Sequence, residues 1–288
     1  MFATGSRLSA AKTVLRGLPI PASAIPLVLK TFGVKLEGLD KPMRCRDRWN
    51  TFTIEIEEPT DAIQQHILLR GFFEFYETSI VRKLVRPGNT FVDIGANIGW
   101  FTLLACSLVG PGGHVLSFEP AQAAFRSLKH NLSMNNFQQA TVFNEALGAQ
   151  RGTAFLYAHE TGEPGSNSMF AATERAPFET ISVRNGDETL EEVGITHIDF
   201  CKIDVEGAEC EVLKGLSKTL AQGRIAALMI ECNAEALGRA GSSPHELFAL
   251  LKAAGFRVRD VRAQKSEITR AADLQSFANL LCQMPARS

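Results

Sequence analysis

Three groups of residues have types and spacings suited to binding a small polar ligand. The first is Asp93-Ile-Gly95-Ala-Asn97-Ile-Gly99. Glycine permits a sharp turn and lets a ligand approach the backbone, and a helix that follows offers unpaired N–H groups to an anion. With Asn97 inside it, the spacing departs from the G-x-G-x-x-G of dinucleotide folds, so we expect a ligand with a small carboxylate rather than a pyrophosphate. An ordinary tight turn is the alternative, although Asp93 at a strand end is unusual for one.

The second group is a single acid after the next apolar segment. Glu119 follows Val115–Phe118 and precedes Pro120. A carboxylate at this place can accept hydrogen bonds from two ribose hydroxyls. An acid that only favours a helix N-terminus is the alternative. Together with the glycine turn, Glu119 indicates a nucleoside ligand.

The third group gathers three acids directly after an apolar run. Asp204, Glu206 and Glu209 follow Phe200–Ile203. A carboxylate at the end of a buried strand costs free energy unless it is paired or used, so Asp204 is a candidate functional residue. Glu206 shares its side if the strand continues, because strand residues two apart face the same way. Glu209 is interpreted as a solvated acid in the first turn of a helix.

Each of these groups follows a predicted strand in a chain that alternates strands and helices from Thr90 onward. Apolar runs between turn residues predict strands over 91–94, 115–118, 140–143, 200–203, 225–230, 256–261 and 277–282. Apolar spacing of three and four predicts helices near Thr78, over 100–109, from Pro120 and over 210–220, and Ser243-Pro244 begins another. This alternation predicts a mostly parallel sheet with helices on both faces and an antiparallel hairpin at its end. Ligands of such sheets bind at the carboxyl ends of the strands.

The composition is that of a globular protein with no strong charge bias. Of 288 residues, 45% are hydrophobic and 21% charged, and the formal net charge is −1. These values exclude a disordered chain and argue against a global basic field for duplex nucleic acid. None of the six cysteines forms a CxxC pair, which argues against a zinc or redox site and favours a reducing, cytoplasmic location. His159, His197 and His245 have no catalytic or ligand-like neighbours in the sequence.

The N-terminal segment differs from the rest of the chain. Residues 1–36 contain five basic residues, no acid and three prolines. We expect one or two helices covering the main domain, with a peripheral membrane or partner contact as the alternative. The segment fits no secretory signal, and the chain has no uncharged apolar run of about 18 residues for a membrane span. We place an N-terminal arm at 1–45 and the main domain at 46–288, with a half-buried strand over 52–56.

The three groups together resemble the FkbM family of S-adenosylmethionine-dependent methyltransferases. The likeness rests on Phe91–Gly99, Phe118-Glu119-Pro120, Asn131, Asn135 and Lys202–Glu209, and covers residues 74–284. It implies the class I methyltransferase fold, which is Rossmann-like. This fold has a seven-stranded sheet, mostly parallel with an antiparallel last strand, and helices on both faces.

The resemblance also implies a cofactor, S-adenosyl-L-methionine, and residues that bind it. By position, Asp93, Gly95, Asn97 and Gly99 line its methionine part and Glu119 takes its ribose, with Glu145 or Ala146 near the adenine. Ser166, Asn167 and Ser168 resemble a polar segment of the family's variable region. Family members typically methylate hydroxyl oxygens of sugars, glycolipids or natural products, so the implied partner is a small-molecule or glycan acceptor.

We therefore predict an O-methyltransferase with Asp204 and Glu206 as its catalytic residues. A sugar hydroxyl is a poor nucleophile, and a carboxylate near the methyl group can take its proton. We assign no metal ligands, and the sequence leaves open whether Mg²⁺ is needed. Some related O-methyltransferases hold Mg²⁺ with acids at this strand end, but Glu231-Cys232-Asn233 lacks an Asp-Asn or Asp-Asp pair after the fifth strand.

Two other functions remain open, a nucleotide-binding Rossmann oxidoreductase and a non-catalytic nucleoside-binding module. A nucleic acid is not expected as a partner, because Asp204-Val205-Glu206-Gly207 differs from the Asp-Pro-Pro-Tyr type of segment in enzymes that methylate base amino groups. The sequence leaves the acceptor and the oligomeric state open.

Overall fold

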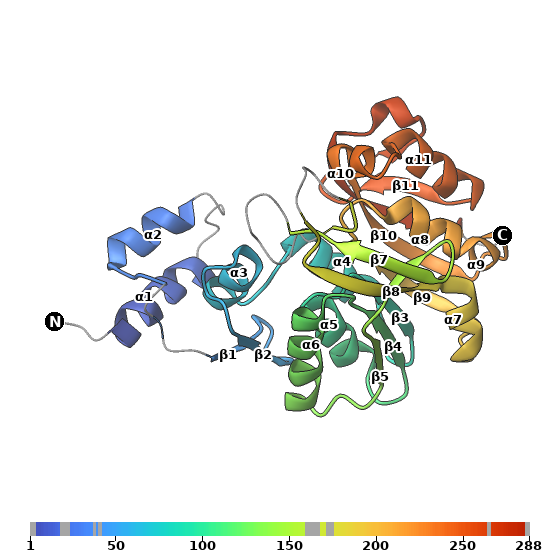
Figure 1. Ribbon diagram of the computed structural model, residues 1–288. Coiled ribbons are helices and arrows are strands. Elements are labelled where there is room, and N and C mark those ends of the chain that lie inside the picture. Colours follow the sequence, from blue (N-terminus) through green and yellow to red (C-terminus); the bar gives the residue numbers. More distant parts are fainter. Residues whose placement is uncertain are drawn as a thin grey trace. The chain divides into compact units, whose positions relative to one another are not determined.

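The computed structural model describes residues 4–17, 24–36, 39, 42–158, 168–170, 176–263 and 266–285. It divides into two compact units, Met1–Phe75 and Tyr76–Ser288 (Figure 1). The elements of the first unit are α1 (Thr4–Gly17), α2 (Ile25–Phe32), β1 (Met43–Arg46), β2 (Thr53–Ile56) and α3 (Ala62–Arg70).

The first unit contains the two predicted N-terminal helices and a β-hairpin. Strand β2 confirms the strand expected over 52–56, whereas β1 was not predicted. The two strands pair antiparallel with Cys45 opposite Ile54. The Asp47 carboxylate closes the hairpin by accepting hydrogen bonds from the N–H groups of Thr51 and Phe52. The domain boundary expected at residue 45 lies within β1, and the assignment of the arm stays a prediction.

The second unit contains the alternating elements. Its helices are α4 (Phe75–Leu84), α5 (Trp100–Val109), α6 (Gln122–Met134), α7 (Gly186–Glu192), α8 (Glu209–Gly215), α9 (Ser217–Ala221), α10 (Ala234–Arg239), α11 (Pro244–Ala253) and the 3₁₀ turn η3 (Ala271–Asp273). Its strands are β3 (Thr90–Ile94), β4 (His114–Phe118), β5 (Ala140–Phe143), β6 (Ala146–Gly148), β7 (Gly152–Leu156), β8 (Glu179–Asn185), β9 (Ile198–Ile203), β10 (Ile225–Asn233), β11 (Arg257–Asp260), β12 (Glu267–Ile268) and β13 (Phe277–Gln283). In the described residues, no helix has the length and apolar character needed to cross a membrane.

The central sheet has the strand order β12-β11-β13-β10-β9-β3-β4-β5. Strands β5, β4, β3, β9 and β10 are parallel, and β13 is antiparallel to both β10 and β11. This topology confirms the class I methyltransferase fold, with the two-residue strand β12 as an addition at one edge. The strand order reverses between β3 and β9, which places the expected ligand site at their carboxyl ends.

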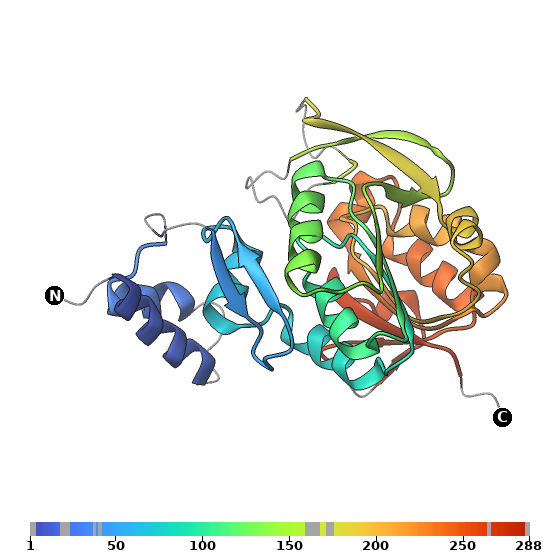
Figure 2. The ribbon, with the colours of Figure 1, turned by 90° about the horizontal axis from the view of Figure 1, so that it is seen from below.

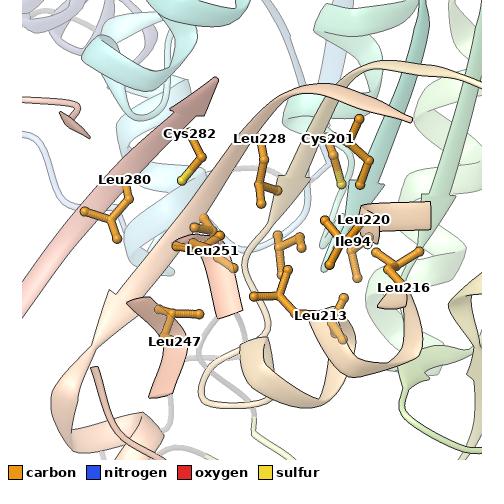
Figure 3. Packing of buried hydrophobic residues seen from close by; sticks show 14 of the residues in the cluster. Ile94, Cys201, Leu213, Leu216, Leu220, Leu228, Leu247, Leu251, Leu280 and Cys282 are labelled. Carbon is orange, nitrogen blue, oxygen red and sulfur yellow. The ribbon is translucent and has the colours of Figure 1, made fainter. Parts of the chain in front are cut away.

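The two faces of the central sheet differ in character. One face packs on helices α7, α8, α9 and α11 through a continuous apolar cluster that includes Ile94, Cys201, Leu213 and Leu251 (Figure 3). The opposite face carries a row of polar side chains near the carboxyl ends of the strands. Register makes this row, since Ser117, Asp93 and Lys202 lie opposite one another on β4, β3 and β9 and therefore point to the same side.

A second sheet, of order β6-β8-β7, was not predicted, and its strands lie between β5 and α7 in the sequence (Figure 2). The helix expected over 210–220 is in fact two helices, α8 and α9, which are separated at Leu216. The second sheet explains this division. At Gly215 an added Cβ would lie 2.1 Å from the carbonyl oxygen of Gly148. Helix α8 therefore ends in direct backbone contact with β6, at a residue that needs no side chain.

Candidate active site

The turn after β3 is in backbone contact with the end of β9. Gly95 has φ +87°, and a Cβ there would lie 1.8 Å from the carbonyl oxygen of Asp204. The Asp204 N–H donates to the Ile94 carbonyl at 2.9 Å. Only glycine fits this position, because any side chain would push the two strand ends apart.

Helix α6 holds the same turn from the other side. The Asn131 side chain donates to the Ile98 carbonyl at 2.9 Å, and Asn135 donates to the Asn131 carbonyl. At Gly99, with φ +99°, an added Cβ would lie 2.6 Å from a methyl carbon of Leu128. Of the two asparagines that carried the family resemblance, Asn131 therefore braces the turn, whereas Asn135 caps the C-terminal end of α6.

Glu119 lies where the sequence places it, at the end of β4 beside the glycine turn. Its carboxylate accepts hydrogen bonds from the N–H of Asn97 at 2.7 Å and of Ala121 at 2.8 Å. Burial raises the pKa of Glu119 to about 7 even though both amides favour the charged form. Each carboxylate oxygen can accept a second hydrogen bond, so Glu119 is oriented by the backbone and still able to receive two hydroxyls. Asn144, which the sequence analysis missed, donates to the Glu119 carbonyl at 3.0 Å.

Asp93 is buried beneath α5, with 1% of its surface exposed. One carboxylate oxygen accepts a 2.6 Å hydrogen bond from the Thr102 hydroxyl, and the other has no partner among the described residues. Burial raises the pKa of Asp93, and the charge of Lys202 opposes this effect. The orphaned oxygen is suited to a cationic or hydrogen-donating ligand group.

Lys202 is the buried cation of the polar row. Its ammonium lies 2.6 Å from Asp204 and 4.5 Å from the ring centroid of Phe101. The Lys202 side chain is 6% exposed, whereas that of Asp204 is 26% exposed. The pair thus reaches from the interior to the surface at the end of β9.

Three carboxylates converge beyond Lys202. Asp204, Glu206 and Glu231 each offer an oxygen, and these atoms all lie within 4.8 Å of one another. Burial and the neighbouring Asp204 charge raise the pKa of Glu206 to about 8 and that of Glu231 to about 10. One oxygen of Glu231 is buried without a partner among the described residues.

Glu209 lies under this cluster and is fully buried, whereas the sequence analysis interpreted it as a solvated acid. One of its oxygens accepts from the N–H groups of Val205 and Gly207, and the other has no described partner. Burial raises the pKa of Glu209 to about 7. Its role in the structure is to fold the acid-bearing loop back onto the start of α8.

Glu231 is the principal residue that the sequence analysis left out of the site. It lies on β10 opposite Asn279 of β13, and the Asn279 side chain donates to Glu77 of α4 at 2.8 Å. The signal that could have found it was the one used for Asp204, an acid near the carboxyl end of a buried apolar strand. Glu231 was not assigned because the metal-binding pattern expected after this strand is Asp-Asn or Asp-Asp, which does not include a glutamate.

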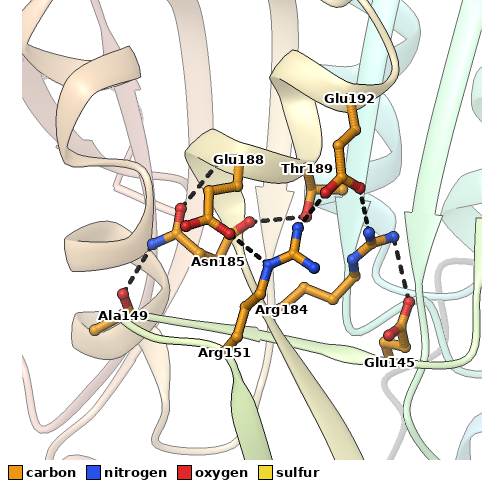
Figure 4. A network of polar contacts seen from close by, with 8 residues as sticks. All are labelled: Glu145, Ala149, Arg151, Arg184, Asn185, Glu188, Thr189 and Glu192. Atoms are coloured by element: carbon orange, nitrogen blue, oxygen red, sulfur yellow. Dashed lines mark hydrogen bonds and ion pairs between the residues drawn. The ribbon is translucent and has the colours of Figure 1, made fainter.

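Glu145 and Ala146, expected near the adenine, lie where β5 leads into the second sheet. Glu145 forms an ion pair with Arg184 of β8 at 3.4 Å, and Arg184 also binds Glu192 of α7 (Figure 4). Ala146 is buried in β6.

The polar segment of the variable region is described only in part. Ser166 and Asn167, like His159, lie outside the described residues. Ser168 donates to the Glu206 carbonyl at 2.6 Å, so this segment contacts the acid-bearing loop.

Comparison with known proteins agrees with this geometry. The model of the methyltransferase FkbM domain family matches residues 93–258. Methyltransferase sdnD of Sordaria araneosa is 29% identical over 163 residues, which are 46% of this chain and 62% of that protein.

Two further relatives have names that state a substrate. The 31-O-demethyl-FK506 methyltransferase FkbM of Streptomyces tacrolimicus is 32% identical over 46% of this chain and 61% of its own length. The hexuronic acid methyltransferase AglP of Haloferax volcanii is 27% identical over 59% of this chain and 65% of its own length. The chain thus spans about three fifths of the length of these three relatives. Because the family model covers more than half of the chain, including all three sequence groups, the chain belongs to the methyltransferase FkbM domain family.

Proposed function

We propose that this chain is an S-adenosylmethionine-dependent O-methyltransferase that acts on a hydroxyl of a sugar, glycolipid or natural product. The observation that carries the proposal is the Glu119 carboxylate, which two backbone amides fix beside the Gly95 turn at the strand-order reversal. A carboxylate fixed in this way is suited to a ribose. Asp93, with its orphaned oxygen, is suited to the cofactor's ammonium.

The bound cofactor would supply a methyl group activated by its sulfonium. The chain would supply alignment and a place for the hydroxyl proton. Asp204, held by Lys202, is proposed at the methyl-transfer centre, and Glu206 beside it supports the acceptor. Their carboxylates lie at the edge of the sheet where β3 and β9 end, next to the proposed cofactor site.

The acceptor class is supported by relatives. One is named for the 31-O position of FK506 and another for a hexuronic acid, and both names describe methylation of an oxygen-rich natural molecule. An acidic, partly exposed loop end is compatible with a polyhydroxylated acceptor, since carboxylates accept hydrogen bonds from hydroxyls.

Calorimetry of cofactor binding tests the first half of the proposal. S-adenosylmethionine and its demethylated product should bind in preference to NAD. Glu119→Ala should weaken binding by about 10- to 100-fold, the equivalent of one or two hydrogen bonds to a charged group. The matched control is Glu188→Gln, a remote acid on α7. Tight NAD binding with none of S-adenosylmethionine would refute the assignment.

Turnover tests the second half. Labelled S-adenosylmethionine incubated with extracts of cell lipids and glycans should identify the labelled product. With that acceptor, Asp204→Asn should lower turnover by about 10²–10⁴-fold while largely sparing cofactor affinity, because the loss falls on proton transfer. Full turnover in Asp204→Asn would remove Asp204 from the catalytic centre.

A further inference from the structure

The carboxylates at the ends of β9 and β10 form a cluster with too little positive charge around it. Asp204, Glu206 and Glu231 each place an oxygen within 4.8 Å of the others. The charges of Arg239 and Lys202 oppose the rise in the pKa of Glu206. Lys202 contacts one oxygen of Asp204, at 2.6 Å, and Arg239 is engaged with Glu235 at 2.9 Å.

A second observation points to a missing ligand. Glu231 is 9% exposed, and one of its oxygens is buried without a hydrogen-bond partner in the described part of the chain. Glu209, fully buried below the cluster, likewise has one oxygen without a described partner. Buried carboxylate oxygens are ordinarily hydrogen-bonded or bound to a metal. A buried oxygen without such a partner costs about 1–3 kcal/mol, and more if the carboxylate is charged.

The spacing of the oxygens fits a single hard cation. Mg²⁺ and Mn²⁺ ions bind oxygen at about 2.1 Å and Ca²⁺ at about 2.4 Å, so ligand oxygens around one ion lie about 3–4.8 Å apart. The three carboxylate oxygens meet that condition. Carboxylate oxygens suit the hard ions Mg²⁺, Mn²⁺ and Ca²⁺, and the three residues of the cluster offer neither sulfur nor imidazole.

We infer that Asp204, Glu206 and Glu231 bind one hard divalent cation, of the Mg²⁺, Mn²⁺ or Ca²⁺ class. This proposal departs from the sequence-based expectation of no metal, because Glu231 takes the place of the Asp-containing pair sought after the fifth strand. If the proposed methyl transfer is also right, the ion would bind the acceptor oxygen and lower the pKa of its hydroxyl, while a carboxylate oxygen not bound to the ion takes the proton.

The test measures metal binding directly, on the full chain after treatment with a chelator and desalting. Mn²⁺ titration followed by electron paramagnetic resonance should show one bound ion per chain. Mg²⁺ or Ca²⁺ should displace it. Glu231→Gln and Glu206→Gln should each weaken Mn²⁺ binding at least tenfold. Glu191→Gln, whose side chain is 78% exposed on α7, should leave binding unchanged.

A thermal measurement keeps the variants interpretable. Mn²⁺ should raise the unfolding temperature of the wild type and of Glu191→Gln, because a ligand that binds the folded state stabilises it, and it should not raise that of Glu231→Gln. Without metal, Glu231→Gln should unfold close to the wild-type temperature, because burial raises the pKa of Glu231 to about 10 and glutamine, like the protonated carboxyl, carries no charge. Absence of stoichiometric binding at millimolar Mn²⁺, or equal binding by Glu231→Gln, would overturn the inference.

This result is separable from that of the proposed function. S-adenosylmethionine binding without Mn²⁺ binding leaves the methyltransferase proposal in place and refutes the metal site. Mn²⁺ binding without S-adenosylmethionine binding does the opposite.

Discussion

Replacing Gly95 with alanine tests the central feature of the site, the backbone contact between the ends of β3 and β9. The added Cβ would lie 1.8 Å from the carbonyl oxygen of Asp204, about 1.5 Å closer than an ordinary carbon–oxygen contact. Alanine also has to adopt φ +87°, which costs about 1–2 kcal/mol. Overpacking against the backbone adds about 1–3 kcal/mol. We expect Gly95→Ala to lower the free energy of unfolding by about 2–5 kcal/mol.

Two other glycines separate these contributions. Gly88 has φ +83° with no atom within 4 Å of an added Cβ, so Gly88→Ala carries only the backbone cost. Gly112 has neither a positive φ nor a close neighbour, so Gly112→Ala should be near neutral. Urea denaturation followed by circular dichroism should rank the losses Gly95→Ala, then Gly88→Ala, then Gly112→Ala.

The same series reports on the site. Moving the Asp204 carbonyl displaces the acid-bearing loop from the glycine turn, so Gly95→Ala should weaken S-adenosylmethionine binding at least tenfold, measured by calorimetry on the folded variant. Gly88→Ala and Gly112→Ala should leave it unchanged. The reasoning fails if Gly95→Ala and Gly88→Ala differ in stability by less than about 0.5 kcal/mol.

Two further predictions concern the buried charges. Lys202→Met leaves Asp93 and Asp204 without their shared cation and should cost about 3–5 kcal/mol in urea denaturation at pH 7, whereas Lys218→Met, at a side chain 59% exposed, should cost little. Burial raises the pKa values of Glu119 and Glu209 from 4.5 to about 7, so the folded state keeps protons that the unfolded state releases. Stability from this source is fully present below pH 4.5 and is lost as pH rises through 7, on the order of 3 kcal/mol per group. The urea concentration at the unfolding midpoint should therefore decrease as the pH is raised from 5 to 8. A midpoint that stays constant or increases over this range would contradict the prediction.

The sequence was sufficient where local pattern and global fold agree. The strand–helix alternation from Thr90 to Phe118 was predicted nearly to the residue, because each strand is a short apolar run closed by a turn. The same agreement located Gly95 and Glu119, since strand ends of a parallel sheet gather at one edge.

Long-range pairing explains what the sequence did not reveal. Exposed and buried residues do not alternate regularly along β7 and β8, so neither strand has a clear sequence pattern. Their pairing joins residues far apart in the sequence, such as Gly152 and Val183, which are 31 positions apart. The break between α8 and α9 depends on the approach of Gly148 to Gly215, which no local pattern encodes.

Whether residues 1–36 contact a membrane remains a prediction, which a vesicle-binding assay on a truncated chain can test.

The contrast between the two sheet faces explains how the fold tolerates its acidic row. On one face, Ile94, Ile203 and Ile230 pack into an apolar cluster that stabilises the sheet. On the other, Asp93, Lys202 and Glu231 place charges at the same edge, where burial disfavours the ionised carboxylates. Each such carboxylate costs stability in the isolated chain, and the apolar face offsets that cost. Buried carboxylates that destabilise the chain indicate where ligands bind. We expect the cofactor's ammonium to pair with Asp93 and a cation to pair with Glu231.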